Sequence, residues 1–255
     1  MLLLSLIRNE NMKIYFRPRT WVMIGLLAVA IVGFAVLTKS FIADEAVGML
    51  NFMSNATYLS FLVLVFSVVI ASDIVAGEFT WGTIKLLLIR PVSRWKILLS
   101  KYIAVLLFML LLTVVLFVVS LLSGMLLMGV NGPGDANLTM GGVWRSYGFE
   151  LINQLLGVTF AFMLSTVFRS SVLAISLSFA IMFASGTVMQ VLIALKKEWA
   201  KYILFANTDL SMYFGGRTPP FESMTLGFSI LMLALYYIVF VGLAWIIFGK
   251  RDVAG

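Results

Sequence analysis

Seven of the charged side chains of this sequence lie in one short stretch, residues 73–101, which lies between two long hydrophobic runs. Five of the 18 basic residues of the chain occur here, namely Lys85, Arg90, Arg94, Lys96 and Lys101. Two acidic residues, Asp73 and Glu78, precede them. Carboxylate, ammonium and guanidinium groups at such spacing can form strong ionic hydrogen bonds, either within the loop or with another protein. The chemistry that this stretch offers is therefore ionic hydrogen bonding.

The residue types exclude several kinds of enzymatic chemistry. The chain of 255 residues contains no His and no Cys, which removes imidazole acid–base catalysis, thiolate nucleophiles and the commonest zinc ligands. An intramembrane enzyme would need paired polar groups, yet we predict that the two acids at the edges of spans, Asp73 and Glu150, lie on opposite sides of the membrane. No P-loop pattern occurs, so nucleotide hydrolysis would have to come from another chain. We expect no catalytic residue, metal site or cofactor in this chain.

Composition predicts a membrane protein. The chain is 62% hydrophobic and 11% charged, with a mean hydropathy of +1.08. Windows of about 20 apolar residues are long enough to cross a bilayer. Six such spans are predicted, at residues 21–37, 54–74, 97–126, 148–168, 172–195 and 224–248. The fold class that we expect is an all-α polytopic membrane protein whose residues 1–255 form one transmembrane domain.

The first 19 residues are basic and carry apolar side chains that fit loosely onto one helical face. Leu3, Ile7 and Ile14 are examples, and Pro18 is expected to end the helix. This pattern predicts an amphipathic helix at the membrane surface, with a disordered basic tail as the alternative. A cleaved signal peptide is not expected, because the apolar segment Met1–Ile7 is short and no basic residue precedes it.

Basic residues predict the orientation. With both termini in the cytoplasm, 12 of the 18 basic residues lie on the inner side, and cytoplasmic loops carry the excess of Lys and Arg. We predict cytoplasmic N- and C-termini in a bacterial plasma membrane. The net charge of +7 is explained better by this topology than by binding of nucleic acid, because the basic residues cluster beside the spans.

The middle of the basic stretch contains a break. Residues 84–89 are mostly apolar, Pro91 cannot continue a helix, and Ser93 lies at the position of an N-cap for the next helix. This pattern predicts a short, partly amphipathic helix at the membrane face, a break, and a return into the bilayer.

The same stretch resembles a motif of a known family. An acidic residue, a Gly-Thr pair, a leucine-rich turn and Pro-x-Ser-Arg follow one another, as Glu78, Gly82, Thr83, Leu87, Leu88, Pro91, Ser93 and Arg94. This order resembles the loop after the second span of ABC-2 type transporter permeases, where a coupling helix docks on a separate ATPase. The resemblance implies that the loop 75–96 couples to an ATPase through Glu78, Gly82, Thr83, Arg90, Pro91 and Arg94. An ordinary loop, basic only because of topology, is the alternative.

Two further regions bear on transport. Residues 196–223 are too apolar for a solvated loop and too short to span, and they resemble the re-entrant external segment before the last span of this family. Polar side chains within spans 4 and 5 could line a substrate path, and the candidates are Asn153, Ser176, Ser185 and Gln190. Gly157, Ala161 and Ser165, at four-residue spacing, predict close helix packing.

The resemblance implies a permease subunit of an ATP-driven ABC exporter. Such a subunit would form the substrate path in the lipid bilayer as a dimer, with a second copy or a related permease, above two ABC ATPase subunits that bind ATP. The family transports antimicrobial peptides, antibiotics, lipids and small ions. A secondary transporter driven by an ion gradient is the alternative, and an intramembrane lipid-modifying enzyme is a weaker one.

Overall fold

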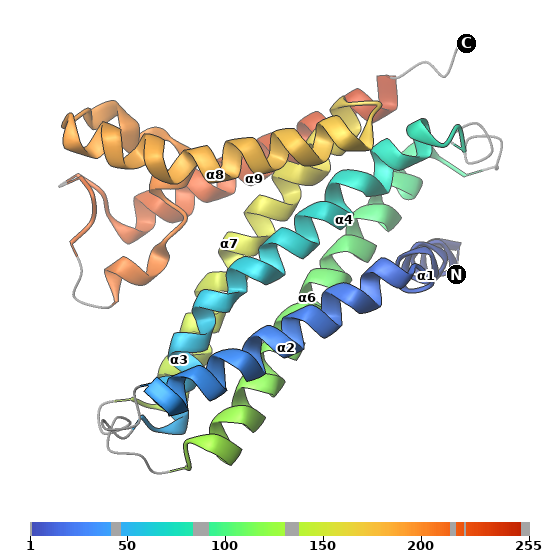
Figure 1. The fold of residues 1–255 in the computed structure, drawn as a ribbon. Coiled ribbons are helices and arrows are strands. Elements are labelled where there is room, and N and C mark those ends of the chain that lie inside the picture. The colour runs from blue at the N-terminus through green and yellow to red at the C-terminus, as the bar shows by residue number, and fades with distance from the viewer. Residues whose placement is uncertain are drawn as a thin grey trace. The chain divides into compact units, whose positions relative to one another are not determined.

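The computed structural model describes residues 2–41, 47–83, 92–130, 138–214, 218–221 and 223–250, and the regular structure within these ranges is entirely helical. Among the described residues, six helical stretches are long and apolar enough to cross a membrane. They are α2 (Pro18–Phe41), α4 (Ser60–Thr80, which continues from α3 and η1), α6 (Arg94–Leu127), α7 (Met140–Val167), α8 (Ser171–Ala194) and α9 (Leu226–Lys250) (Figure 1). The predicted all-α class with six spans is confirmed.

The chain divides into two compact units. The first contains Met1–Glu10, Ser67–Val105 and Leu155–Gly255, and the second contains Asn11–Phe66 and Leu106–Gln154. The boundary falls within four helices, which are α1 (Leu2–Tyr15), α4, α6 and α7. Both described ends of the basic stretch belong to the first unit, together with α8 and α9.

In the second unit, α3 (Met49–Ala56) and the short 3-10 helix η1 (Thr57–Leu59) precede α4. The ring of Phe52 in α3 stacks on Phe34 of α2, with 5.7 Å between the centroids. Gly124 of α6 permits a close approach, because a Cβ atom there would lie 3.1 Å from the Met49 side chain and 3.3 Å from the Phe52 ring. Aromatic contact and a missing side chain thus join these helices.

Hydrogen bonds between side chains also link the helices of the second unit. Ser60 donates to the Glu150 carboxylate at 2.7 Å, and Thr113 donates to the Gln154 side-chain oxygen at 2.9 Å. Glu150, an acid predicted at the edge of a span, therefore has a partner on α4. A bonded polar group costs far less to bury in an apolar environment than an unbonded one.

In the first unit, the segment between α8 and α9 folds into three 3-10 helices. These are η3 (Glu198–Tyr202), η4 (Leu204–Ala206) and η5 (Leu210–Tyr213), beside α8 and α9 in Figure 1. Their buried side chains pack with Met189 and Met224 in one hydrophobic cluster. The buried amide of Asn207 donates to the carbonyls of Lys201 and Ile203, at 2.8 and 3.0 Å, and accepts from Ser229 at 2.8 Å. The segment is thus an ordered apolar structure, while its insertion into a leaflet stays a prediction.

Some predicted boundaries differ from the observed ones. Pro18 does not end the first helix. Instead α1 ends at Tyr15, and Pro18 is the first residue of α2, a position where its missing N–H costs nothing. Side chains from the first turn of α2 satisfy the last carbonyls of α1. The Thr20 hydroxyl donates to the Ile14 carbonyl at 2.6 Å, and the Trp21 indole donates to the Tyr15 carbonyl at 2.9 Å.

Two helices extend beyond the predicted apolar windows. α4 continues to Thr80, so residues 75–80 of the predicted coupling loop are helical, and α7 begins at Met140 rather than near residue 148. An apolar window marks the part of a helix that suits lipid, whereas backbone hydrogen bonds continue into polar sequence. Ser93 directly precedes α6, as predicted.

Candidate functional site

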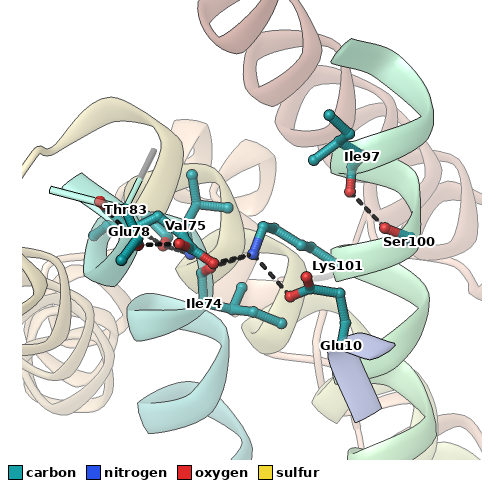
Figure 2. A network of polar contacts seen from close by, with 10 residues as sticks. Glu10, Ile74, Val75, Glu78, Thr83, Ile97, Ser100 and Lys101 are labelled. Carbon is teal, nitrogen blue, oxygen red and sulfur yellow. Dashed lines mark hydrogen bonds and ion pairs between the residues drawn. The ribbon is translucent and has the colours of Figure 1, made fainter. Parts of the chain in front are cut away.

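Lys101 is the centre of a buried ionic network in the first unit. Its Nζ atom lies 2.8 Å from Glu10 Oε2, 3.0 Å from Glu78 Oε1 and 3.1 Å from the Ile74 carbonyl oxygen (Figure 2). The side chains of Lys101, Glu10 and Glu78 are 1%, 7% and 13% exposed. An ammonium group has three N–H donors, so these three acceptors satisfy it completely.

The network joins three helices that are distant in sequence. Glu10 lies in α1, Glu78 in the last turn of α4, and Lys101 two turns into α6. Glu78 and Lys101 stand on either side of the predicted coupling loop, one before it and one after it. The ion pair between them therefore closes the loop at its base.

Burial raises the energetic cost of breaking this network. Charge-assisted hydrogen bonds of this length are roughly twice as strong as neutral ones. Removing one partner of a buried ion pair leaves an uncompensated charge, which costs about 3 to 5 kcal/mol. The arrangement therefore disfavours any movement that separates α4 from α6 at this point.

The turn after α4 is organised by the residues of the predicted motif. The Thr83 hydroxyl donates to the Glu78 carboxylate. Gly82 has φ of +68°, a left-handed conformation that glycine adopts without strain, and its N–H donates to Phe79 O at 3.1 Å. Glycine also occurs where another backbone approaches closely. Within the described residues a Cβ atom there would contact nothing within 4 Å, so the turn conformation is the reason that the structure gives for glycine.

The remaining coupling residues are described only in part. Arg94, at the start of α6, donates from Nη1 to the Gly249 carbonyl at 3.2 Å, which links this end of the loop to α9. Arg90 and Pro91 lie outside the described residues, as does the predicted short helix at residues 84–89.

The end of α4 is also bound to α7 and to the turn before α8. The buried Ser165 hydroxyl accepts from the N–H groups of Val75 and Ala76, at 3.1 and 2.9 Å. The Thr80 hydroxyl contacts the Arg169 carbonyl and the Ser171 hydroxyl, both at 3.4 Å. The small-residue spacing of span 4 predicted close packing, but the role of Ser165 as an acceptor for α4 was not predicted.

The four candidate substrate-path residues belong to different units or to different faces of one helix. Ser176 and Ser185 donate to carbonyls of their own helix, at Leu173 and Met182. They are nine residues apart, which at about 100° per residue puts them on opposite faces of α8. Gln190 is exposed on α8, and Asn153 is half-buried on α7 in the second unit. The path through these residues stays a prediction.

A different hydroxyl of α8 is buried. Ser178 is fully buried and shares a hydrogen bond of 3.1 Å with Ser72 of α4. Within the described ranges no group of three or more acidic residues could hold a metal ion. The described network connects α1, α4 and α6 at the base of the loop.

Comparisons with known proteins agree with a membrane protein. A family model described as "Protein of unknown function (DUF2705)" matches residues 10–254. The chain is similar to "Uncharacterized protein YhcI" of Bacillus subtilis (strain 168), with 39% identity over 314 aligned residues that cover 99% of this chain and 100% of that protein. It is also similar to "Uncharacterized membrane protein YdbK" of the same strain, with 32% identity over 244 residues that cover 95% of this chain and 99% of that protein. With six helices that suit a bilayer and a family match over nearly its whole length, this chain is a multi-pass membrane protein that belongs to the DUF2705 family.

Proposed function

We propose that this protein is the membrane-spanning permease subunit of an ATP-driven exporter, of the ABC-2 type that the loop motif resembles. It would work as a dimer, with a second copy or a related permease, in a bacterial plasma membrane with both termini in the cytoplasm. Two separate ATPase subunits would bind and hydrolyse ATP. The observation that carries the proposal is the ion pair between Glu78 and Lys101 at the base of the loop 75–96.

The ion pair suits a loop that transmits force. A partner that moves the loop pulls on the end of α4 and the start of α6 at once, because Glu78 and Lys101 hold the two ends together. Glu10 extends the same connection to α1. Rigid elements that move together convert closure of a partner into a change of state of the spans, provided that the partner binds the two states unequally.

The described ends of the loop also suit protein docking. Trp81 and Trp95 are exposed, and the Lys96 ammonium lies 5.5 Å from the centre of the Trp95 ring. Arg94 is exposed beside them. Aromatic and Arg side chains are enriched among the residues that dominate protein–protein binding energy. Tryptophan at the membrane interface is the competing use of the same residues.

Crosslinking tests the proposal directly, because the chain has no natural cysteine. The variant Thr83→Cys would carry a thiol-reactive photocrosslinker in membranes of the source organism. The expected product is an adduct with an ABC ATPase, identified by a peptide that contains a P-loop. The matched variant Ser40→Cys, at the other end of the first span, should give no such adduct. Crosslinks at position 83 to lipid or to this chain alone would refute the proposed partner.

A functional measurement separates the proposal from its alternative. In liposomes, transport should require the ATPase subunits and ATP. Transport that an ion gradient drives without any ATPase would establish the secondary-transporter alternative instead.

A further inference from the structure

The end of α8 carries an unusual concentration of positive charge. Lys196 and Lys197 directly follow the helix, and Lys201 lies four residues further on. Because a helix rises about 1.5 Å per residue, Lys196 lies about 3 Å beyond the last residue of an apolar candidate span. We therefore expect its backbone at the level where a bilayer changes from acyl chains to headgroups.

Lys196 adopts a backbone conformation that lysine rarely takes. Its φ is +49°, and it is the only non-glycine residue with positive φ in the described part of the chain. The surrounding hydrogen bonds form a Schellman motif, with Lys196 N–H donating to Ile193 at 2.9 Å and Lys197 N–H to Leu192 at 3.0 Å. Glycine is the usual residue at this position, because it has no Cβ atom to strain the turn. The lysine side chain, rather than the backbone, accounts for the residue found here.

Exposed apolar side chains occur beside the lysines along the same short segment. Leu195, Trp199 and Tyr202 are 59%, 58% and 52% exposed. Water disfavours such a surface, whereas the interface of a membrane accommodates aromatic rings beside ammonium groups that extend toward phosphates.

The segment that carries these side chains is packed against its neighbours. Ala200 is fully buried in the hydrophobic cluster of the 3-10 helices. The Lys201 ammonium donates to the Ser223 hydroxyl at 2.9 Å and lies 5.4 Å from the centre of the Tyr202 ring. The ammonium groups of Lys196 and Lys197 have no hydrogen bond or ion pair to another described residue.

We infer that residues 195–202, the α8-end patch, bind the headgroup phosphates of anionic phospholipids in the leaflet at which α8 ends. Three lysines against the single Glu198 give the patch a charge of +2. Lysines near an anionic membrane surface strengthen binding by about fivefold each. This inference does not depend on the proposed transport function.

A simpler role would also place lysines here. Cations at the end of a helix interact favourably with its dipole, and that role needs no lipid. The two roles differ in what they predict for the residue at position 196, because only lipid binding depends on the membrane composition.

The experiment compares the wild type, three single variants and one triple variant of the full chain. Each is placed in nanodiscs that contain either phosphatidylcholine alone or a mixture with phosphatidylglycerol. Lys196→Gly removes the charge and also the backbone strain of the positive φ angle. Lys196→Asn removes the charge and keeps a residue that adopts positive φ more readily than lysine, and Lys196→Arg keeps the charge. Native mass spectrometry measures the retained phosphatidylglycerol, and thermal unfolding in phosphatidylcholine measures stability.

The glycine and asparagine variants should lose about fivefold of the preference for phosphatidylglycerol, whereas the arginine variant should keep it. Replacing all three lysines, as Lys196→Gly with Lys197→Gln and Lys201→Gln, should lose about a hundredfold. The glycine variant should at the same time unfold at a higher temperature than the wild type, because the turn is relieved. Two results for the glycine variant would overturn the inference: a lipid preference equal to that of the wild type, or a lower unfolding temperature than the wild type in phosphatidylcholine. Either result would show that Lys196 acts through the helix dipole instead. Equal retention of both lipids by the wild type would also overturn the inference.

Discussion

Replacing Lys101 by methionine tests whether the buried network holds α1, α4 and α6 together. Methionine keeps much of the length and flexibility of lysine but has no ammonium group. The variant would leave the carboxylates of Glu10 and Glu78 facing a neutral side chain, where each had a partner within 3.0 Å.

The size of the effect follows from burial. The Lys101 side chain is 1% exposed, and removing one partner from a buried ion pair costs about 3 to 5 kcal/mol. Glu78 is the most exposed member at 13%, so water can solvate it in part, and we expect about 3 kcal/mol. For a chain of this size, such a loss corresponds to a decrease of about 10 °C in the unfolding midpoint.

The assay is thermal unfolding of the detergent-purified protein, followed by the fluorescence of its six tryptophans. Lys96→Met is the matched control on the same helix. Lys96 contacts an exposed ring rather than a buried carboxylate, so its loss should change the free energy of unfolding by less than about 0.5 kcal/mol. A triple variant with Lys101→Met, Glu10→Gln and Glu78→Gln should recover part of the stability, because no buried charge then lacks its partner.

Two results would refute this reasoning. If Lys101→Met and Lys96→Met destabilise the protein equally, the network does not hold the helices. The second concerns the triple variant. If the changes at Glu10 and Glu78 each lower the free energy of unfolding further, and their losses add to that of Lys101→Met, the three charges act independently rather than as one network.

The remaining predictions concern packing, orientation and energy source. Ser165→Ala should lower the free energy of unfolding by about 1 to 2 kcal/mol, because two buried N–H groups of α4 lose an acceptor. The control Ser185→Ala should leave it nearly unchanged. Equal unfolding midpoints of the two variants would show that Ser165 does not hold α4. In intact cells an impermeant thiol reagent should label Ser40→Cys, and it should label Ser93→Cys only after permeabilisation. The reason is that the basic residues predict a cytoplasmic position for residue 93. The reverse labelling pattern would disprove the orientation. The purified chain should not hydrolyse ATP in a phosphate-release assay, because it has no P-loop pattern, and hydrolysis by the chain alone would contradict a separate ATPase.

The sequence by itself determined the class of the protein. Long apolar windows predict helices, because lipid offers no hydrogen bonds and each spanning segment must satisfy its own backbone groups. The missing His and Cys residues likewise limit the available chemistry, however the chain folds. These properties are local or compositional, so they can be read from the chain alone.

Only the tertiary structure decided which charges meet. In sequence, Glu10 is the one acid of a basic N-terminal segment, and Lys101 is one of five basic residues around a loop. They are 91 positions apart, and their ion pair exists because α1 and α6 pack together with the end of α4. Helix ends were also decided in three dimensions. α4 continues past its apolar window until Gly82 adopts positive φ, since backbone hydrogen bonds, rather than hydrophobicity, determine where a helix stops.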